Sequence, residues 1–239
     1  MDTNQFANEE KKSNCVYPAG YKVKRITEQT NILRQLFPDI GTADEKLAEQ
    51  SLPANAEGLF AIPRWQKVAE TYNKAVEKIL ELIKQQRKGK FYNWRKDKLG
   101  KHYLRQHERT IAMLKKLSDQ QNGNDILVVA SQFGFRHRDC SVCRARKMFG
   151  ASEFGLGAFE IGCMLLTHPK RFISNDNLWI DCAGDEYSLE ANDLFDSTPF
   201  FYFSRNDIRF DAYLNSRTSD IHGSASAFIS QHSKQNFEV

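Results

Sequence analysis

Residues 152–169 carry apolar side chains on nearly every side, so a helix formed here has to be enclosed by the rest of the chain. Ser152 is a residue type that caps helices and Glu153 places an acid in the first turn, so we predict that the helix starts at this point. The segment is too short and too interrupted to span a membrane. Its three glycines each lower helix stability by ~1 kcal/mol relative to alanine, which indicates close approach of another backbone. They are Gly155, Gly157 and Gly162.

A second apolar segment lies a little earlier in the chain. Residues 126–130 read ILVVA, a continuous run rich in β-branched side chains that is typical of a strand buried on both faces. The turn-forming residues 122–125 precede it, which supports the start of a new element there. A buried strand followed by a buried helix places both at the centre of the fold.

The remaining pattern predicts an α+β protein, with a helical N-terminal half packed with a small, mostly antiparallel β region in the C-terminal half. We expect one domain over residues 17–232, with disordered tails at 1–16 and 233–239. Apolar periodicity and turn signals give the other elements. Helices are predicted at 26–37, 63–89 and 102–120, and strands at 17–24, 178–182, 200–203, 208–213 and 224–229.

Composition restricts the class of protein. Hydrophobic residues make up 41% and charged residues 27% of the 239 residues, which suits a globular chain. Five cysteines, an odd number, favour reduced thiols in a cytoplasm. No apolar run follows a basic N-terminal start, so we expect no signal peptide. The sequence therefore predicts a cytoplasmic protein.

Charge is distributed unevenly along the chain. The whole sequence has a net charge of +4, but residues 84–116 hold twelve Lys or Arg against two acids, a net charge of +10. Residues 171–239 hold five Lys or Arg against eleven acids, a net charge of −6. A basic middle region indicates an anionic partner, or an acidic surface of another subunit.

Aromatic side chains are interleaved with the cations in residues 90–101, which read KFYNWRKDKLGK. Basic side chains can pair with phosphates while aromatic rings stack on bases, so this composition suits nucleic acid. A solvated charge run or a connector anchored by its aromatic residues is the alternative. We predict DNA contacts from Lys88, Lys90, Arg95, Lys96, Lys98, Lys101 and Arg105, and from a second cluster at Arg136, Arg138, Arg144 and Arg146.

Three closely spaced soft ligands raise the question of zinc. His137, Cys140 and Cys143 have H-x2-C-x2-C spacing, but a zinc site of strong signal shows two such pairs. The same thiols can be packed inside a short helix, and we predict no metal. A fourth ligand would have to come from Cys163, His168 or Cys182.

A cluster of acids gives an enzymatic alternative. Asp181, Asp185 and Glu186 stand at the end of a predicted strand, and carboxylates of this kind can hold Mg²⁺ for phosphodiester cleavage. An acidic surface turn is the favoured explanation, because no further acid has a motif spacing. A nuclease of a mobile element and a non-catalytic protein-interaction module therefore remain alternatives to DNA binding without catalysis.

A series of short blocks in residues 60–215 resembles the AcaB/RovC type of bacterial transcriptional activators, whose relatives are encoded on integrating conjugative elements and plasmids. The blocks are SQFGFRHR, SVCRARKMF, EFGLGAF, LLTHPKR, IDCAGDEYS and FFYFSRNDIRF.

This resemblance implies binding to double-stranded promoter DNA by a homo-oligomer, without catalysis, cofactor or obligatory metal. It further implies activation of type VI secretion genes and a hexameric assembly. It assigns no individual DNA-contacting residue, so the prediction that the cations named above contact DNA is based on their charge and position alone. In the family pattern Cys140 and Cys143 are not required, which weakens the zinc hypothesis.

Overall fold

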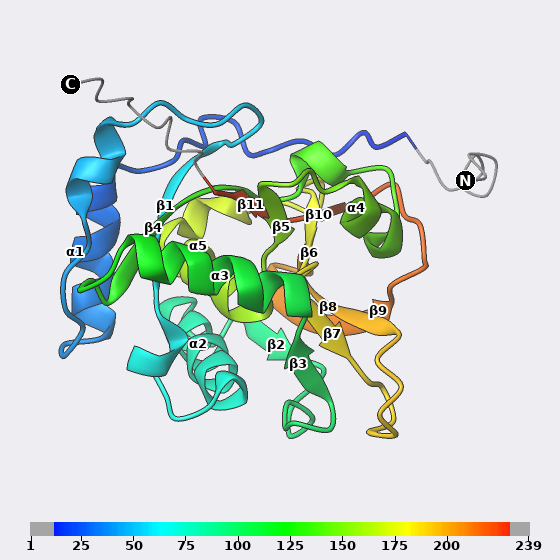
Figure 1. The fold of residues 1–239 in the computed structure, drawn as a ribbon. Coiled ribbons are helices and arrows are strands. Elements are labelled where there is room, and N and C mark those ends of the chain that lie inside the picture. Colours follow the sequence, from blue (N-terminus) through cyan, green and yellow to red (C-terminus); the bar gives the residue numbers. More distant parts are fainter. Residues whose placement is uncertain (1–11, 230–239) are drawn as a thin grey trace.

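The computed structural model describes residues 12–229, which form two β-sheets around a central helix (Figure 1). The smaller sheet has four antiparallel strands in the order β1-β4-β11-β5. Every residue of β4 is buried, so the predicted strand at 126–130 is confirmed and extends to Gln132. The strands are β1 (Gly58–Pro63), β4 (Ile126–Gln132), β5 (Glu153–Gly155) and β11 (Ser226–Phe228).

The larger sheet has seven strands and is mostly antiparallel. Its longest strand pair is the β8–β9 hairpin, in which eight residues of each strand pair. The predicted hairpin is therefore confirmed and is longer than expected. Two pairs are parallel, β2 with β9 and β10 with β6. The strands are β2 (Phe91–Asn93), β3 (Leu104–Gln106), β6 (Trp179–Asp181), β7 (Asp185–Tyr187), β8 (Ser197–Ser204), β9 (Asp207–Leu214) and β10 (His222–Ser224).

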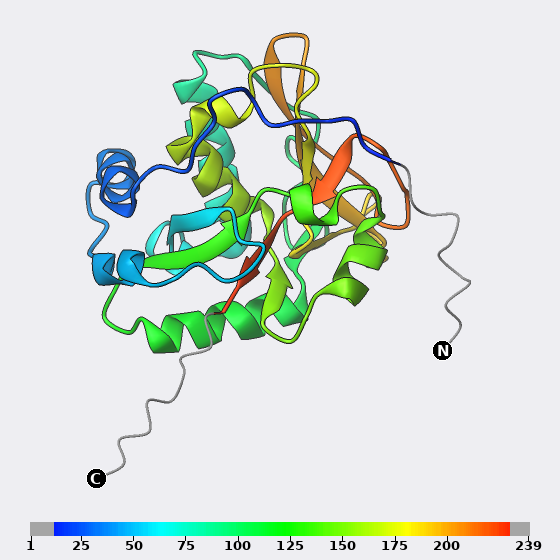
Figure 2. The same ribbon diagram turned by 90° about the horizontal axis from the view of Figure 1, so that it is seen from above.

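Helix α5 (Ala158–Thr167) lies at the centre, and all ten of its residues are buried. Helix α2 (Tyr72–Gln86) packs against it through an apolar stripe. In Figure 2 the four-stranded sheet lies between α5 on one side and α3 on the other. The other helices are α1 (Ile26–Leu36), α3 (Glu108–Gln120) and α4 (Val142–Met148), with short 3-10 turns η2 (Glu45–Glu49), η3 (Trp65–Lys67), η4 (Phe135–His137) and η5 (Pro169–Arg171).

The predicted start of the central helix at Ser152 is wrong. Residues 153–155 form β5, because they pair with β11 and because the backbone at Gly155 lies against residues 183 and 184, where a Cβ would come within 2.5 Å of the Ala183 carbonyl carbon. The helix begins at Ala158, where the Glu160 carboxylate accepts a hydrogen bond from the Gly157 backbone N–H at 3.0 Å. The close backbone approach inferred from the glycines therefore holds for Gly155.

Two other predicted helices are shorter than expected. Pro63 ends β1 instead of starting a helix, and the α-helix of the apolar stripe begins only at Tyr72, after the short 3-10 turn η3. Residues 104–106 form β3 before α3 begins at Glu108. The predicted strand at 17–24 is absent from the described residues, where Val16 makes only an isolated bridge to Asn177.

The α+β class is confirmed, but the division into a helical first half and a β second half is only partly right. Strands β1, β2 and β3 lie in the first half, and the central helix lies in the second. The predicted tail at 233–239 and residues 1–11 lie outside the described part of the chain. No helix between residues 12 and 229 is long and apolar enough to cross a membrane.

The contact between α2 and α5 gives a test of the core. A Cβ added at Gly162 would lie 2.2 Å from Cγ2 of Ile79, a β-branched side chain with little rotamer freedom in a helix. We predict that Gly162→Ala lowers the free energy of unfolding by about 1–3 kcal/mol through overpacking. Urea denaturation measures this change. Gly150→Ala is the control, because a Cβ there has no atom within 4 Å; equal effects of the two substitutions would contradict the packing.

Candidate nucleic-acid interface

The outer face of the seven-stranded sheet carries a row of side chains that crosses five strands. Tyr92 of β2 is paired with Arg209 of β9, and Arg209 is paired with Tyr202 of β8. The Tyr202 ring lies 4.3 Å from the Trp179 ring of β6, and Trp179 is paired with His222 of β10. Residues in register on neighbouring strands point to the same face, so these five side chains form one row.

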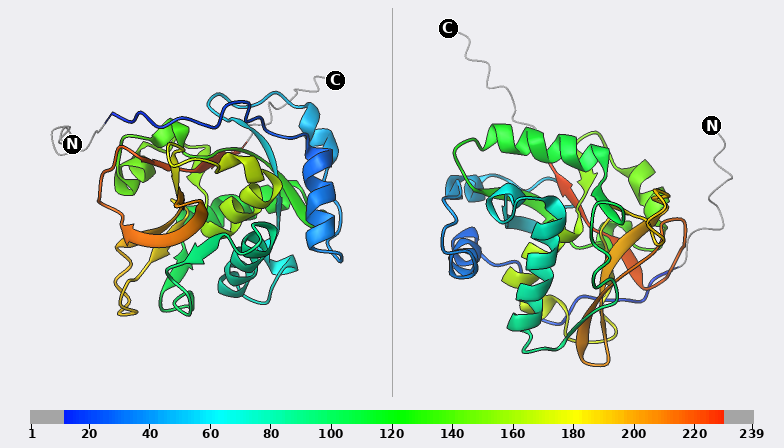
Figure 3. Two further views of the ribbon diagram at one scale, coloured as in Figure 1. Left: turned by 180° about the vertical axis from the view of Figure 1, so that it is seen from behind. Right: turned by 90° about the horizontal axis from the view of Figure 1, so that it is seen from below.

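Alternation along the hairpin separates this row from the core. Phe201 and Phe210 point to the opposite face, where they are fully buried with ring centroids 4.9 Å apart. Their neighbours Tyr202 and Arg209 are partly exposed. The hairpin lies at one side of the molecule, away from α1 (Figure 3). One face of β8 and β9 therefore builds the core, while the other is available to a ligand.

Two further aromatic contacts extend the row toward solvent. The Trp94 indole N–H donates a hydrogen bond to the Tyr202 hydroxyl at 3.0 Å, and the Trp94 ring centroid lies 4.6 Å from that of Tyr92. Tyr92 is 51% exposed and Trp94 is 50% exposed. We call the surface formed by Tyr92, Trp94, Trp179, Tyr202 and Arg209 the aromatic face.

Arg209 is the cation at the centre of the aromatic face. Its Nε is buried and has no hydrogen-bond partner, and no carboxylate between residues 12 and 229 forms an ion pair with its guanidinium. Leaving a buried donor unsatisfied is costly. The nearby Arg95 differs, because its guanidinium donates to the Asp211 carboxylate at 2.7 Å and to the Ala212 carbonyl at 2.9 Å. Arg209 thus has unused capacity for an acceptor from outside the described chain.

The lysines predicted from the sequence lie around the same strand. Lys90 and Lys96 come directly before and after the segment that holds Tyr92 and Trp94. All five predicted lysines are exposed, and their ammonium groups make no ion pair within residues 12–229. They are Lys88, Lys90, Lys96, Lys98 and Lys101.

Most of the predicted arginines instead make internal contacts. Arg105 donates to the Glu186 carboxylate at 2.8 Å and lies over the Phe195 ring at 3.9 Å. Arg136 donates to Glu153 at 3.3 Å. These contacts hold loops and strands together, as does the ion pair of Arg95, so the three arginines are less available than the lysines.

The arginines of the second predicted cluster, residues 136–146, also contact other groups of the protein. The Arg138 guanidinium lies 4.1 Å from the Phe135 ring and 3.6 Å from the Asp139 carboxylate. Arg146 donates to the backbone carbonyls of residues 183 and 185, and burial lowers the pKa of its guanidinium. Arg144 is partly exposed on α4, where its backbone N–H donates to the capping Ser141 hydroxyl at 3.3 Å. Arg136, Arg138 and Arg146 are therefore engaged in contacts within the chain.

The residues considered for zinc face different partners. The His137 ring lies 2.6 Å from a Glu153 oxygen, a contact that helps to lower the pKa of that carboxylate against the effect of burial. The Cys140 thiol donates to the His137 carbonyl at 3.6 Å, and the Cys143 thiol donates to the Asn215 side chain at 2.9 Å. No group of three His, Cys, Asp or Glu residues in the described chain could hold a metal ion.

The three acids considered for a nuclease site each contact other groups of the protein. The Asp181 carboxylate lies 2.7 Å from the His222 ring nitrogen and accepts from the Tyr213 hydroxyl at 3.1 Å. Glu186 is paired with Arg105. Asp185 accepts from the Tyr72 hydroxyl and from the Ala158 backbone N–H, both at 2.7 Å. Each carboxylate thus has at least one partner in the protein, although Oδ2 of Asp181 is buried without one in the described chain. These contacts weaken the nuclease alternative.

Two buried carboxyl groups meet at the start of α5. Burial raises the pKa of Glu160 to about 8, and the neighbouring Asp185 adds to this shift. Burial also raises the pKa of Asp185 to about 7, opposed by hydrogen bonds from Ala158 and Tyr72. At neutral pH the Glu160 carboxyl group is therefore mostly protonated.

Sequence reasoning missed Trp179, Tyr202 and Arg209. The signal was present in the alternation of residues 200–210, FFYFSRNDIRF, where every second side chain faces away from the core. The hairpin sequence alone does not show which strand pairs with β9. That strand is β2, more than a hundred residues earlier, and only its pairing with β9 aligns Tyr92 with Arg209.

The chain matches no protein-family model, no curated protein and no solved structure.

The pKa of Glu160 gives a prediction about stability. A carboxyl group whose pKa is higher in the folded than in the unfolded state binds more protons when folded, so its stabilising effect is lost as the pH rises from about 4.5 to about 8. We expect the unfolding free energy of Glu160→Gln, relative to the wild type, to increase over this range and to level off above it. Urea denaturation at a series of pH values measures the difference. Glu190→Gln, at an exposed position, should give a flat difference; a flat result for Glu160→Gln would show that its carboxyl group titrates normally.

Proposed function

We propose that this protein is a DNA-binding transcriptional activator, and that DNA contacts the aromatic face together with the five exposed lysines. The observation that carries the proposal is Arg209, which is in register with Tyr92 and Tyr202 on the neighbouring strands and whose buried Nε has no acceptor in the described chain. A phosphate, a base edge or a sugar oxygen would supply that acceptor.

The chemistry of the surface fits nucleic acid in two ways. Lysine side chains bind phosphates as mobile point charges and release the counterions that DNA condenses. An arginine between aromatic rings can donate two parallel hydrogen bonds while its flat group stacks. Partly exposed Tyr92 and Trp94 add ring faces on which bases or sugars can pack. A surface for an acidic protein partner would need the cations but not the row of rings.

The resemblance to AcaB/RovC-type activators supports the finer part of the proposal. It suggests double-stranded promoter DNA, type VI secretion genes and a homo-oligomer, with a hexamer as the expected assembly. One of the blocks on which it rests, FFYFSRNDIRF, forms most of the β8–β9 hairpin and contains Tyr202 and Arg209 of the aromatic face. The same DNA, incubated with Mg²⁺, also tests the nuclease alternative, because cleavage in place of stable retention would favour it.

The lysines generate a prediction about salt dependence. Each lysine–phosphate contact contributes about 0.9 to the slope of log affinity against log salt. We expect Lys96→Ala with Lys98→Ala to weaken binding to all DNA sequences alike and to flatten the slope by about two contacts. Fluorescence anisotropy at several salt concentrations measures both. The matched control is Lys115→Ala with Lys116→Ala, which removes the same charge from the exposed side of α3. If both pairs behave alike, net charge and not this surface governs binding.

Arg209 generates a sharper prediction. Replacing it by alanine should weaken DNA binding about tenfold or more, because a charge-assisted hydrogen bond is worth roughly 1.5–3 kcal/mol. Arg209→Lys should recover part of the loss, since it keeps the charge but not the planar fork. Arg205→Ala, in the exposed turn of the same hairpin, is the control. Unchanged affinity in Arg209→Ala would remove the aromatic face from the interface.

The oligomer is predicted from the resemblance, and the structure limits where its contacts can lie. The apolar stripe of α2 and the whole of α5 are buried within one chain, so neither is available to another subunit. We expect light scattering in moderate salt to give a mass of several chains, with six as the expected number. A monomer at high protein concentration would contradict this part of the proposal.

A further inference from the structure

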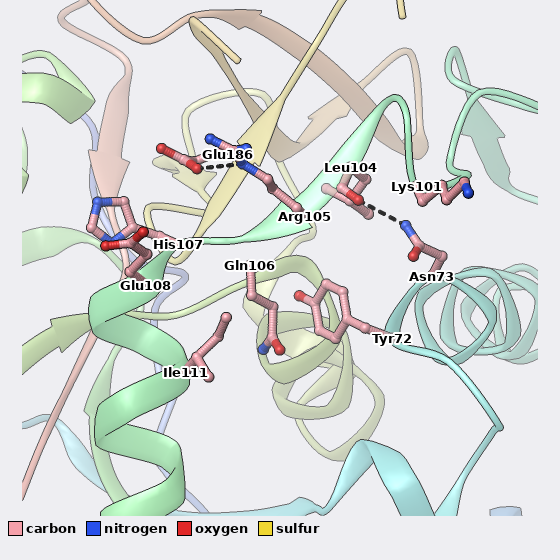
Figure 4. Close-up of a pocket in the computed structure, with 10 residues that line it drawn as sticks. All are labelled: Tyr72, Asn73, Lys101, Leu104, Arg105, Gln106, His107, Glu108, Ile111 and Glu186. Carbon is pink, nitrogen blue, oxygen red and sulfur yellow. Dashed lines mark hydrogen bonds and ion pairs between the residues drawn. The ribbon is translucent and has the colours of Figure 1, made fainter. Parts of the chain in front are cut away.

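A cleft lies between the start of α2 and α3 and extends along α3 to β1 and η3. It consists of two adjoining cavities of about 550 and 510 Å³ that share Gln106 and Ile111 as lining residues. Figure 4 shows Gln106 reaching from β3 into this space, with Tyr72 of α2 on one side and Ile111 of α3 on the other. Cavities of a few hundred cubic ångströms are the usual size for small-molecule sites.

The walls of the 510 Å³ cavity are apolar and aromatic, with a few polar groups. Ile62 and Leu127 come from the four-stranded sheet, and Leu114 comes from α3. Trp65 forms one side and meets the Tyr72 ring edge to face at 6.2 Å. A flat apolar ligand is suited to such walls.

Two polar groups of the cavity have hydrogen-bonding capacity left. The Gln106 side-chain amide nitrogen is buried and has no acceptor within residues 12–229. The Glu160 side chain is only 2% exposed and lines the same cavity, while one of its oxygens accepts from the Gly157 backbone N–H. A ligand in the cavity can accept from Gln106 and exchange a hydrogen bond with Glu160.

The electrostatics of the cavity favour a ligand without charge. Because burial keeps the Glu160 carboxyl group protonated at neutral pH, it does not demand a cation. The cations at the rim are also satisfied: Arg64 donates to the backbone carbonyls of Asn124, Ser118 and Gln121, and Lys115 is paired with Asp119. Neither needs an anionic ligand.

From this arrangement we infer that the cleft between α2 and α3 binds an uncharged, flat heterocycle with adjacent ring C=O and N–H groups, such as the base of a nucleoside. The ring C=O accepts from the Gln106 amide, the ring N–H is read by Glu160, and Trp65 and the aliphatic side chains enclose the ring. The second cavity, lined by Asn73, Lys101 and His107, is polar enough to hold the attached sugar. The site shares Lys101 with the proposed DNA surface, but no residue of the aromatic face lines either cavity.

Isothermal titration with inosine and uridine tests the inference, since both present a ring C=O beside an N–H. We expect saturable binding of at least one of them by the wild type, and about tenfold weaker binding of the corresponding N-methylated nucleoside, because each neutral hydrogen bond is worth ~1 kcal/mol or somewhat more. Gln106→Leu should give a similar loss. Gln85→Leu makes the same chemical change at an exposed position of α2 and should bind normally.

The substitution Glu160→Gln distinguishes a site for a neutral heterocycle from a site for a cationic amine. An amide can still accept from Gly157 and form a hydrogen bond with a neutral ring, so we expect nucleoside binding to stay within about threefold, less than the loss of one hydrogen bond. Benzylamine is the competing probe. The inference is overturned if neither nucleoside binds, if methylation of the ring nitrogen has no effect, or if benzylamine binds and Glu160→Gln abolishes that binding. The methylation comparison uses only wild-type protein, so a variant that fails to fold does not prevent a decision.

Discussion

Burial of α5 is the constraint on which the other elements depend. A ten-residue helix with no exposed residue has to be covered on every side, and α2, β1 and α1 provide much of that cover. Its N-terminal N–H groups cannot reach water, so the fold supplies carboxyl oxygens from Glu160 and Asp185. These acids are placed at the positive end of the helix dipole, but burial offsets that benefit by favouring their protonated forms. The Glu160 carboxyl group that lines the cleft is thus a result of enclosing the helix.

Close contacts between backbones join the two sheets. Gly155 of β5 lies against residues 183 and 184, which precede β7, and Gly134 lies against Gly223 of β10. Any side chain at these positions would overlap with main-chain atoms less than 3 Å away, and main-chain atoms cannot move aside cheaply. The sheets therefore meet without an intervening layer of side chains. On β8 and β9 the aromatic face lies on the side opposite the buried Phe201 and Phe210.

Local patterns predicted some elements well and others poorly, for physical reasons. The run at 126–130 and the hairpin at 200–213 could be identified because their periodicity and turns are local. Ser152 looked like a helix cap because the strand that pairs with residues 153–155 lies more than seventy residues later. Pro63 and residues 104–106 were read as helical for the same reason. At the candidate site, composition indicated the exposed lysines, but Arg95, Arg136 and Arg146 acquire internal partners that no local signal shows.

The position of β11 has a consequence for how the molecule is made. This strand is the last in the described chain, yet it lies inside the four-stranded sheet, between β4 and β5. Its residue Ser226 pairs with Gln132 and Gly155, so the sheet stays open until residues 226–228 have left the ribosome. Contacts of such large sequence separation slow folding, because loop closure has to precede them. During synthesis the facing edges of β4 and β5 are exposed, and at that stage the chain depends most on protection from association with other nascent chains.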